Sequence, residues 1–124
     1  MNSYDERVAS ADPEARAGAV RRAIGQAEAA GLQSAGSCAT TSTRIATANS
    51  AGLFYDQQRT DAQFVMTAMS DDSSGWAQSS GYRWDQLDPD RAARRAVEKA
   101  LAARSPREIP SGKYTVILEP NAAA

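Results

Sequence analysis

The residue types that most enzymes use for nucleophilic and metal chemistry are scarce in this sequence. Its 124 residues include no histidine and one cysteine, so serine–histidine pairs, cysteine–histidine pairs and histidine-based zinc sites cannot form within it. The lysines, Lys99 and Lys113, do not stand three residues after a serine, as the S-x-x-K pattern of serine–lysine enzymes requires. The sequence therefore predicts no catalytic residue and no metal site in the chain itself.

Carboxylates cluster at Asp71-Asp72 and again at Asp85, Asp88 and Asp90. They could bind calcium or act as an acid–base pair, but neither group has the glycine and the final glutamate of an EF-hand loop. The polar run around the first pair is typical of a solvated turn, and Asp88 precedes a proline as a helix N-cap residue does. We favour the turn and capping roles for both groups.

Basic residues concentrate in and just after one predicted helix, at Arg91, Arg94, Arg95, Lys99, Arg104 and Arg107. They could bind phosphates or the acidic surface of a partner, or they could form an ordinary solvated helix face. The net charge of −1 and the sequence pI of about 5.4 provide no general field that would attract nucleic acid or an acidic membrane. We favour the solvated face, and nucleic-acid binding is not expected.

Three aromatic residues and the cysteine have two interpretations each. Trp76, Tyr82 and Trp84 share strand parity and could stack on a base or ligand, but core packing under a helix is the more ordinary role. Cys38 has no CxxC companion or nearby base, so a small buried thiol is favoured over a reactive one. The sequence contains no G-x-G-x-x-G, P-loop or G-x-S-x-G pattern.

Two segments carry helix start signals and helical periodicity. Asp12 and Asp88 each precede a proline, and an acidic residue follows in the first turn. These signals predict helices over 13–30 and 89–104. Their expected apolar stripes consist of Ala17, Val20, Ile24 and Ala27 in the first helix and of Ala93, Val97, Ala100 and Leu101 in the second.

Alternating and β-branched residues predict the strands. Residues 34–48 form one strand, and residues 59–70 and 75–83 form a hairpin, because apolar residues recur at every second position on each side of a polar turn. A last strand is expected over 113–119, buried on both faces since few of its residues are polar. Residues 121–124, which follow a proline, resemble the first turn of another helix.

These elements predict one α+β segment over residues 1–124, in the order α-β-β-β-α-β. The sheet is expected to be largely antiparallel, with both helices on one face. Much of the 42% hydrophobic content is alanine while aromatics make up 6%, so the core buries less area than usual and we expect support from more chain or a partner. No secretory or transmembrane pattern is present, which favours a cytoplasmic location.

Three stretches, taken in order, resemble the TldD/PmbA family, known as modulators of DNA gyrase and as metalloproteases. They are A-T-A-N-S-A-G-L at 46–53, S-G-W-A at 74–77, and A-V-E-K-A-L at 96–101 leading to G-K-Y-T-V-I-L-E-P at 112–120. The resemblance covers nearly the whole chain. Asn49, Ser50 and Gly52 of the first stretch also have ordinary turn chemistry, and we take them as the candidate binding residues.

The resemblance implies that this chain is an internal, non-catalytic part of the N-terminal half of a parent three to four times longer. In catalytic family members the zinc site lies downstream, on a helix bearing His-Glu-x-x-x-His, so zinc is expected only in such a parent and in no residue of this chain. The resemblance further implies a peptide or unfolded-protein substrate and a homo- or heterodimer of family members. The alternative is a stand-alone module that binds a protein or nucleic acid without any enzymatic part.

Overall fold

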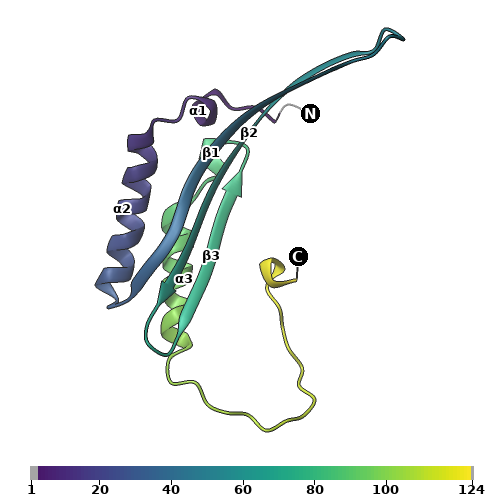
Figure 1. Ribbon diagram of the computed structural model, residues 1–124. Coiled ribbons are helices and arrows are strands. Elements are labelled where there is room, and N and C mark those ends of the chain that lie inside the picture. The colour runs from purple at the N-terminus through teal and green to yellow at the C-terminus, as the bar shows by residue number, and fades with distance from the viewer. Residues whose placement is uncertain (1–2, 124) are drawn as a thin grey trace.

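The computed structural model describes residues 3–123 and contains helices on one side of a three-stranded sheet (Figure 1). Helix α1 spans Glu6–Ala9, α2 spans Pro13–Ala29 and α3 spans Pro89–Ala102. The predicted caps are confirmed, because the side chain of Asp12 accepts a hydrogen bond from the Glu14 amide and that of Asp88 accepts one from the Arg91 amide. The short α1 and a 3-10 helix, η1, at Trp84–Gln86 lie where the sequence predicted no element.

The sheet has the strand order β1-β2-β3 and is antiparallel throughout. Strand β1 runs over Gln33–Ala48, β2 over Phe54–Met69 and β3 over Ser74–Gly81. Residues 33–48 of β1 pair along the whole of β2, whereas β3 pairs only with residues 62–69 of β2. The antiparallel α+β class and the α-β-β-β-α order are therefore confirmed, with β2 beginning five residues earlier than the predicted 59.

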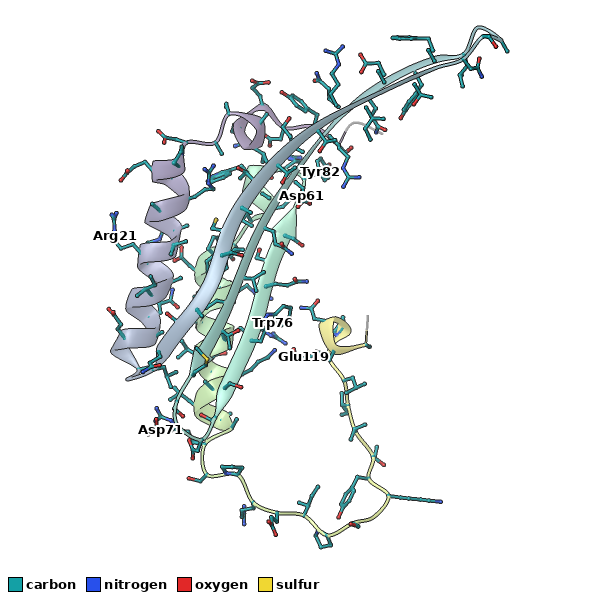
Figure 2. All side chains as sticks on the ribbon, viewed as in Figure 1. Arg21, Asp61, Asp71, Trp76, Tyr82 and Glu119 are labelled. Carbon is teal, nitrogen blue, oxygen red and sulfur yellow. The ribbon has the colours of Figure 1, made fainter. Side chains whose placement is uncertain are left out.

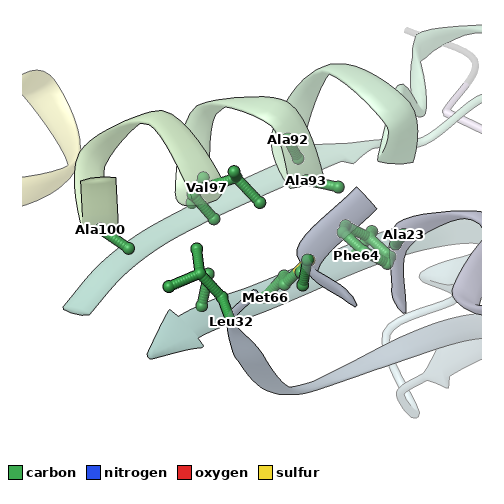
Figure 3. Close-up of a cluster of buried hydrophobic side chains, with 12 residues drawn as sticks. Ala23, Leu32, Phe64, Met66, Ala92, Ala93, Val97 and Ala100 are labelled. Atoms are coloured by element: carbon green, nitrogen blue, oxygen red, sulfur yellow. The ribbon is translucent and has the colours of Figure 1, made fainter. Parts of the chain in front are cut away.

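Both predicted helices cover the same face of the sheet, and the core lies between them and β2 (Figures 1 and 3). The alternation of β2 directs Ala62, Phe64, Met66 and Ala68 into this core, where each is at most 3% exposed. From α3 come Ala92, Ala93, Ala96 and Ala100, all buried. The alanine-rich core expected from the composition is thus confirmed, and Phe64 and Met66 are its largest members on the sheet.

The apolar stripe predicted for the first helix is only partly right. Ala27 is buried and Val20 packs against the core, but Ala17 is exposed and Ile24 is 40% exposed, while Ala19 and Ala23 are buried in their place. Helix α2 packs closely against α3, and a face of alanines permits that approach where a face centred on isoleucine would not. Leu101 of α3 is likewise 40% exposed, against the prediction.

Trp76 and Tyr82 are not core residues, contrary to the sequence-based interpretation. Trp76 is 39% exposed and Tyr82 38% exposed, whereas the flanking Gly75 and Ala77 are buried. A Cβ atom on Gly75 would lie 2.1 Å from the carbonyl oxygen of Ala96 in α3. Because α3 approaches the backbone of β3 this closely, only the small residues fit beneath it and the tryptophan must face the other side of the sheet.

The predicted last strand over 113–119 is wrong. After α3 the chain leaves the sheet in an extended loop without strand pairing and returns to a 3-10 helix, η2, at Pro120–Ala122 (Figure 1). The expected burial on both faces is also wrong, since Ile117 is 97% exposed and Val116 70% exposed. Alternating apolar residues form a strand only where a neighbouring strand supplies hydrogen bonds. The predicted helical turn at 121–124 corresponds to η2, except for residue 124, which lies outside the described residues.

Candidate interaction surface

The β1–β2 hairpin extends far beyond β3 as a two-stranded ribbon (Figure 1). The edge of β3 covers β2 up to residue 62, and Ser3 forms a bridge with Arg59 just beyond it. We call residues 44–58, which lie past both, the arm. Apart from the half-buried Gln57, every residue of the arm is exposed. The arm therefore has no cover on either face within residues 3–123.

The three candidate binding residues from the sequence lie together in the turn at the tip of the arm. The Asn49 side-chain oxygen accepts hydrogen bonds from the amides of Ala51 and Leu53, both at 3.0 Å, and the Gly52 amide donates to the Asn49 carbonyl oxygen at 3.2 Å. Gly52 has φ of +88°, which favours glycine. Asn49 and Gly52 thus shape the turn, and Ser50 is exposed beside them.

Apolar side chains surround this turn and are open to solvent. Leu53 is 55% exposed, Phe54 73% and Tyr55 50%, and Ile45 on the neighbouring strand is 49% exposed. One ion pair braces the arm, between Arg44 and Asp56 at 2.6 Å. This pair lowers the pKa of the Asp56 carboxyl, chiefly through the hydrogen bond from Arg44. An isolated two-stranded ribbon is only marginally stable in water. Its exposed apolar tip is therefore a candidate docking surface.

The face of the sheet opposite the helices is also open. Strand β1 presents small residues there, including Ala35, Ser37 and Ala39, which are exposed. Val65 and Met69 of β2 are half-buried on that face, and Trp76 of β3 projects from it (Figure 2). The tryptophan was the aromatic signal in the sequence, but only the packing of α3 decides which face it occupies.

A recess of about 370 Å³ lies where α2 borders β1. Val20, Ala23 and Ile24 line it from the helix, Phe64 and Met66 line it from the sheet, and residues 34–37 of β1 contribute backbone and small side chains. Within the described part of the chain no strand pairs with the outer edge of β1. An apolar recess beside an unpaired strand edge is the arrangement that accepts an added strand. Periodicity along the sequence does not reveal which strand edge stays free, so the sequence alone could not locate this recess.

The carboxylates at Asp72 and Asp85 and the thiol of Cys38 have contacts that fit structural roles. Asp72 accepts hydrogen bonds from the Ser105 amide at 2.8 Å and the Ser70 hydroxyl at 3.0 Å, and its pKa is lowered, first by the Ser105 bond and then by Ser70. Asp85 pairs with Arg83 at 2.6 Å. Cys38 is half-buried beside the core, and burial raises the pKa of its thiol. A raised pKa makes a thiol less reactive at neutral pH.

Two of the basic residues of α3 converge on one carboxylate. The Glu119 side chain accepts hydrogen bonds from the Arg95 guanidinium and the Lys99 ammonium, each at 2.6 Å. The basic run is otherwise the solvated face that we favoured, since all its residues except the half-buried Lys99 are exposed. Among residues 3–123 no group of three or more metal-binding side chains is placed to hold an ion. No helix in the same range is long and apolar enough to cross a membrane.

Comparison with known proteins agrees with the resemblance noted in the sequence. A family model described as the PmbA/TldA metallopeptidase central domain matches residues 2–104, whereas the sequence suggested the N-terminal domain. The fold is similar to that of a crystal structure from Thermotoga maritima MSB8, described as a proposed modulator of a DNA gyrase, with a TM-score of 0.70 and 19% identity. The alignment covers 90% of this chain and 28% of that one, so the chain spans less than a third of its relative.

No curated protein matches the chain significantly. The similarity to the Thermotoga structure, at 19% identity, concerns the fold. The family model covers most of the chain. On that match, this protein belongs to the PmbA/TldA metallopeptidase family, of which it contains the central domain.

Proposed function

We propose that this chain serves as a non-catalytic scaffold domain within a longer metallopeptidase of its family. The observation that carries the proposal is the arm, whose tip exposes Leu53, Phe54 and Tyr55 while the body of the chain has its own core. A tip of this kind fits docking against another polypeptide. The remainder of the parent chain and a second family member, in a homo- or heterodimer, are the partners that we propose.

The substrate that we propose is an extended peptide or an unfolded segment of a protein. Its support is the recess between α2 and β1, where a peptide could pair with the outer edge of β1 and place side chains against Val20, Ile24 and Phe64. Zinc, where the parent is a catalytic member, would be bound by residues outside this chain. We propose a cytoplasmic location for the parent.

The proposal is tested by changing the arm in the native full-length protein. Replacement of Phe54 and Tyr55 by serine is expected to reduce assembly and peptide hydrolysis, because these side chains contribute buried area only in the docked state. Leu101→Ser is the matched control, since Leu101 is also an exposed apolar residue and lies on α3, away from the arm. Native mass and hydrolysis equal to wild type in the Phe54/Tyr55 variant would contradict the docking role.

A stand-alone binding module is the competing interpretation, and the self-contained core of the chain favours it. Thermal unfolding of the isolated chain separates the two. The scaffold role predicts a broad, low transition and concentration-dependent association through the arm and the free strand edges. A sharp, concentration-independent transition would favour the module.

A further inference from the structure

A small cationic site on α3 is built independently of the carboxylate that it holds. Arg95 and Lys99 are four residues apart and therefore lie on the same side of the helix. The Lys99 ammonium also donates a hydrogen bond to the carbonyl oxygen of Trp76 at 2.9 Å. Strand β3 thus positions the lysine from outside the ion pair. Figure 2 shows Trp76 and Glu119 next to each other at this point of the sheet.

Further hydrogen-bond donors face an adjoining recess of about 330 Å³. Arg91 and Gln78, whose side chains carry such donors, line it together with Arg95. Within residues 3–123 the side chains of Arg91 and Gln78 have no hydrogen-bond or ion-pair partner. The recess also contains Asp88 and Glu119, whose negative charges disfavour a dense phosphate backbone. The available donors therefore suit one or two separate carboxylates better than nucleic acid.

The segment that supplies Glu119 is held to the rest of the chain by few contacts. Its first residue, Ser105, donates its amide to Asp72, and in the described chain residues 106–118 make no hydrogen bond to the helices or the sheet. The side chains of Arg95, Lys99 and Glu119 are 53%, 32% and 40% exposed. Ion pairs at this exposure are weak and exchangeable. The returning chain is thus attached mainly through one replaceable carboxylate.

We propose that Arg95 and Lys99 form a binding site for the carboxylates of an acidic peptide segment, and that Glu119 occupies this site in cis as an autoinhibitory contact. This inference does not depend on the scaffold role. Glu119 shows the ligand chemistry directly, because each of its oxygens accepts from one of the two cations. An external ligand would displace it and also reach Arg91.

A tethered competitor has a predictable effect on binding. The loop from Ser105 to Glu119 keeps the Glu119 carboxylate near the site at an effective concentration on the order of millimolar. An acidic peptide must therefore bind the wild-type chain more weakly than a chain whose internal carboxylate is removed. Deleting any surface carboxylate also favours an acidic peptide, so a tethered competitor predicts a larger gain at Glu119 than at a matched exposed carboxylate.

The test uses a fluorescently labelled tetraglutamate peptide and the native protein that carries this sequence, with anisotropy measured at low salt. Glu119→Gln is expected to tighten binding about fivefold, and Arg95→Gln in that background is expected to abolish it. Glu108→Gln is the matched control, because Glu108 lies on the same segment and is exposed. Arg94→Gln is the control for Arg95, as its neighbour on the same helix. Far-UV circular dichroism verifies that each variant is folded.

Three outcomes would overturn the proposal. Glu108→Gln could tighten binding as much as Glu119→Gln, which would indicate only the general loss of a negative charge. Arg94→Gln could weaken binding as much as Arg95→Gln, which would indicate a diffuse basic field. Inorganic phosphate or a tetralysine peptide could bind the Glu119→Gln chain as tightly as tetraglutamate, which would exclude a carboxylate site.

Discussion

Apolar residues are buried in the body of the molecule and exposed in its two projecting segments. In the body, formed by α2, α3 and the sheet they cover, the apolar residues that face the helices are buried, and most of them are alanines. In the arm and in residues 105–119 the apolar residues are larger and exposed, with Phe54 at 73% and Ile117 at 97%. The proposed docking against other polypeptide would cover these large exposed residues, while the small ones form the chain's own core.

The two phenylalanines give the largest expected difference between these regions. Phe64→Ala should destabilise the chain by about 3–5 kcal/mol, since its side chain is 2% exposed in the core. Phe54→Ala should change the free energy of unfolding by about 0.5 kcal/mol or less, because the side chain already meets solvent. Urea denaturation of both variants measures the contrast. Similar losses at the two positions would mean that the arm contributes to the core.

Two glycines sharpen the comparison within the body. Gly75→Ala is expected to cost about 1–3 kcal/mol, because its Cβ would lie 2.1 Å from the Ala96 carbonyl oxygen and 2.5 Å from the Ala100 amide nitrogen. Gly25→Ala on α2 meets no atom within 4 Å and should stabilise the chain by about 0.5–1 kcal/mol. Thermal unfolding of the two variants shows whether each substitution stabilises or destabilises the chain. A stabilised Gly75→Ala chain would disprove the close contact between α3 and β3.

Local signals in the sequence were sufficient for part of the body, namely the helix starts and the buried face of β2. The caps at Asp12 and Asp88 fix two helix starts, and the alternation from Thr60 to Ala68 identifies the buried face of β2, because both depend on neighbouring residues alone. The family resemblance came from short motifs in order, and one of them, the turn at 49–52, proved to be the tip of the arm. The turn was therefore predictable, although its position far from the core was not.

The remaining features depend on contacts between distant residues. Trp76 faces away from the helices because α3 needs Gly75 and Ala77 beneath it, and strand parity alone cannot choose between the two faces. Residues 113–118 have the alternation of a strand but no strand beside them within the described chain. The hydrogen bonds from Arg95 and Lys99 to Glu119 form only because the chain returns to α3. None of these contacts is encoded by spacing along the sequence.

In the turn at the arm tip, two substitutions are expected to differ by a smaller amount in their effect on stability. Asn49→Ala removes the acceptor for two amide hydrogen bonds and is expected to destabilise the arm by about 1 kcal/mol. Ser50→Ala is the control in the same turn, and its effect should be negligible. Amide chemical shifts of residues 44–58 would report the change. Equal effects of the two substitutions would mean that the Asn49 side chain does not organise the turn.

Acidification should release residues 105–119 from α3. Of the changes considered, it is expected to have the smallest effect on the fold. Lys99, and then Arg95, lower the pKa of the Glu119 carboxyl from its ordinary value of 4.5. The attachment is therefore complete above pH 4.5 and is lost as the pH falls through the lowered pKa. Amide chemical shifts of residues 116–118 should follow this titration, while Glu119→Gln removes it. A titration that persists in the variant would exclude Glu119 as its origin.

The most direct test of the account compares amide hydrogen exchange in the isolated chain with exchange in the native protein that carries this sequence. If other polypeptide covers the arm and residues 105–119, these segments should gain strong protection in the native protein, while residues 62–69 of β2 should be protected in both. Equally fast exchange of the arm in both samples, together with a native mass of 13.2 kDa, would contradict the scaffold role.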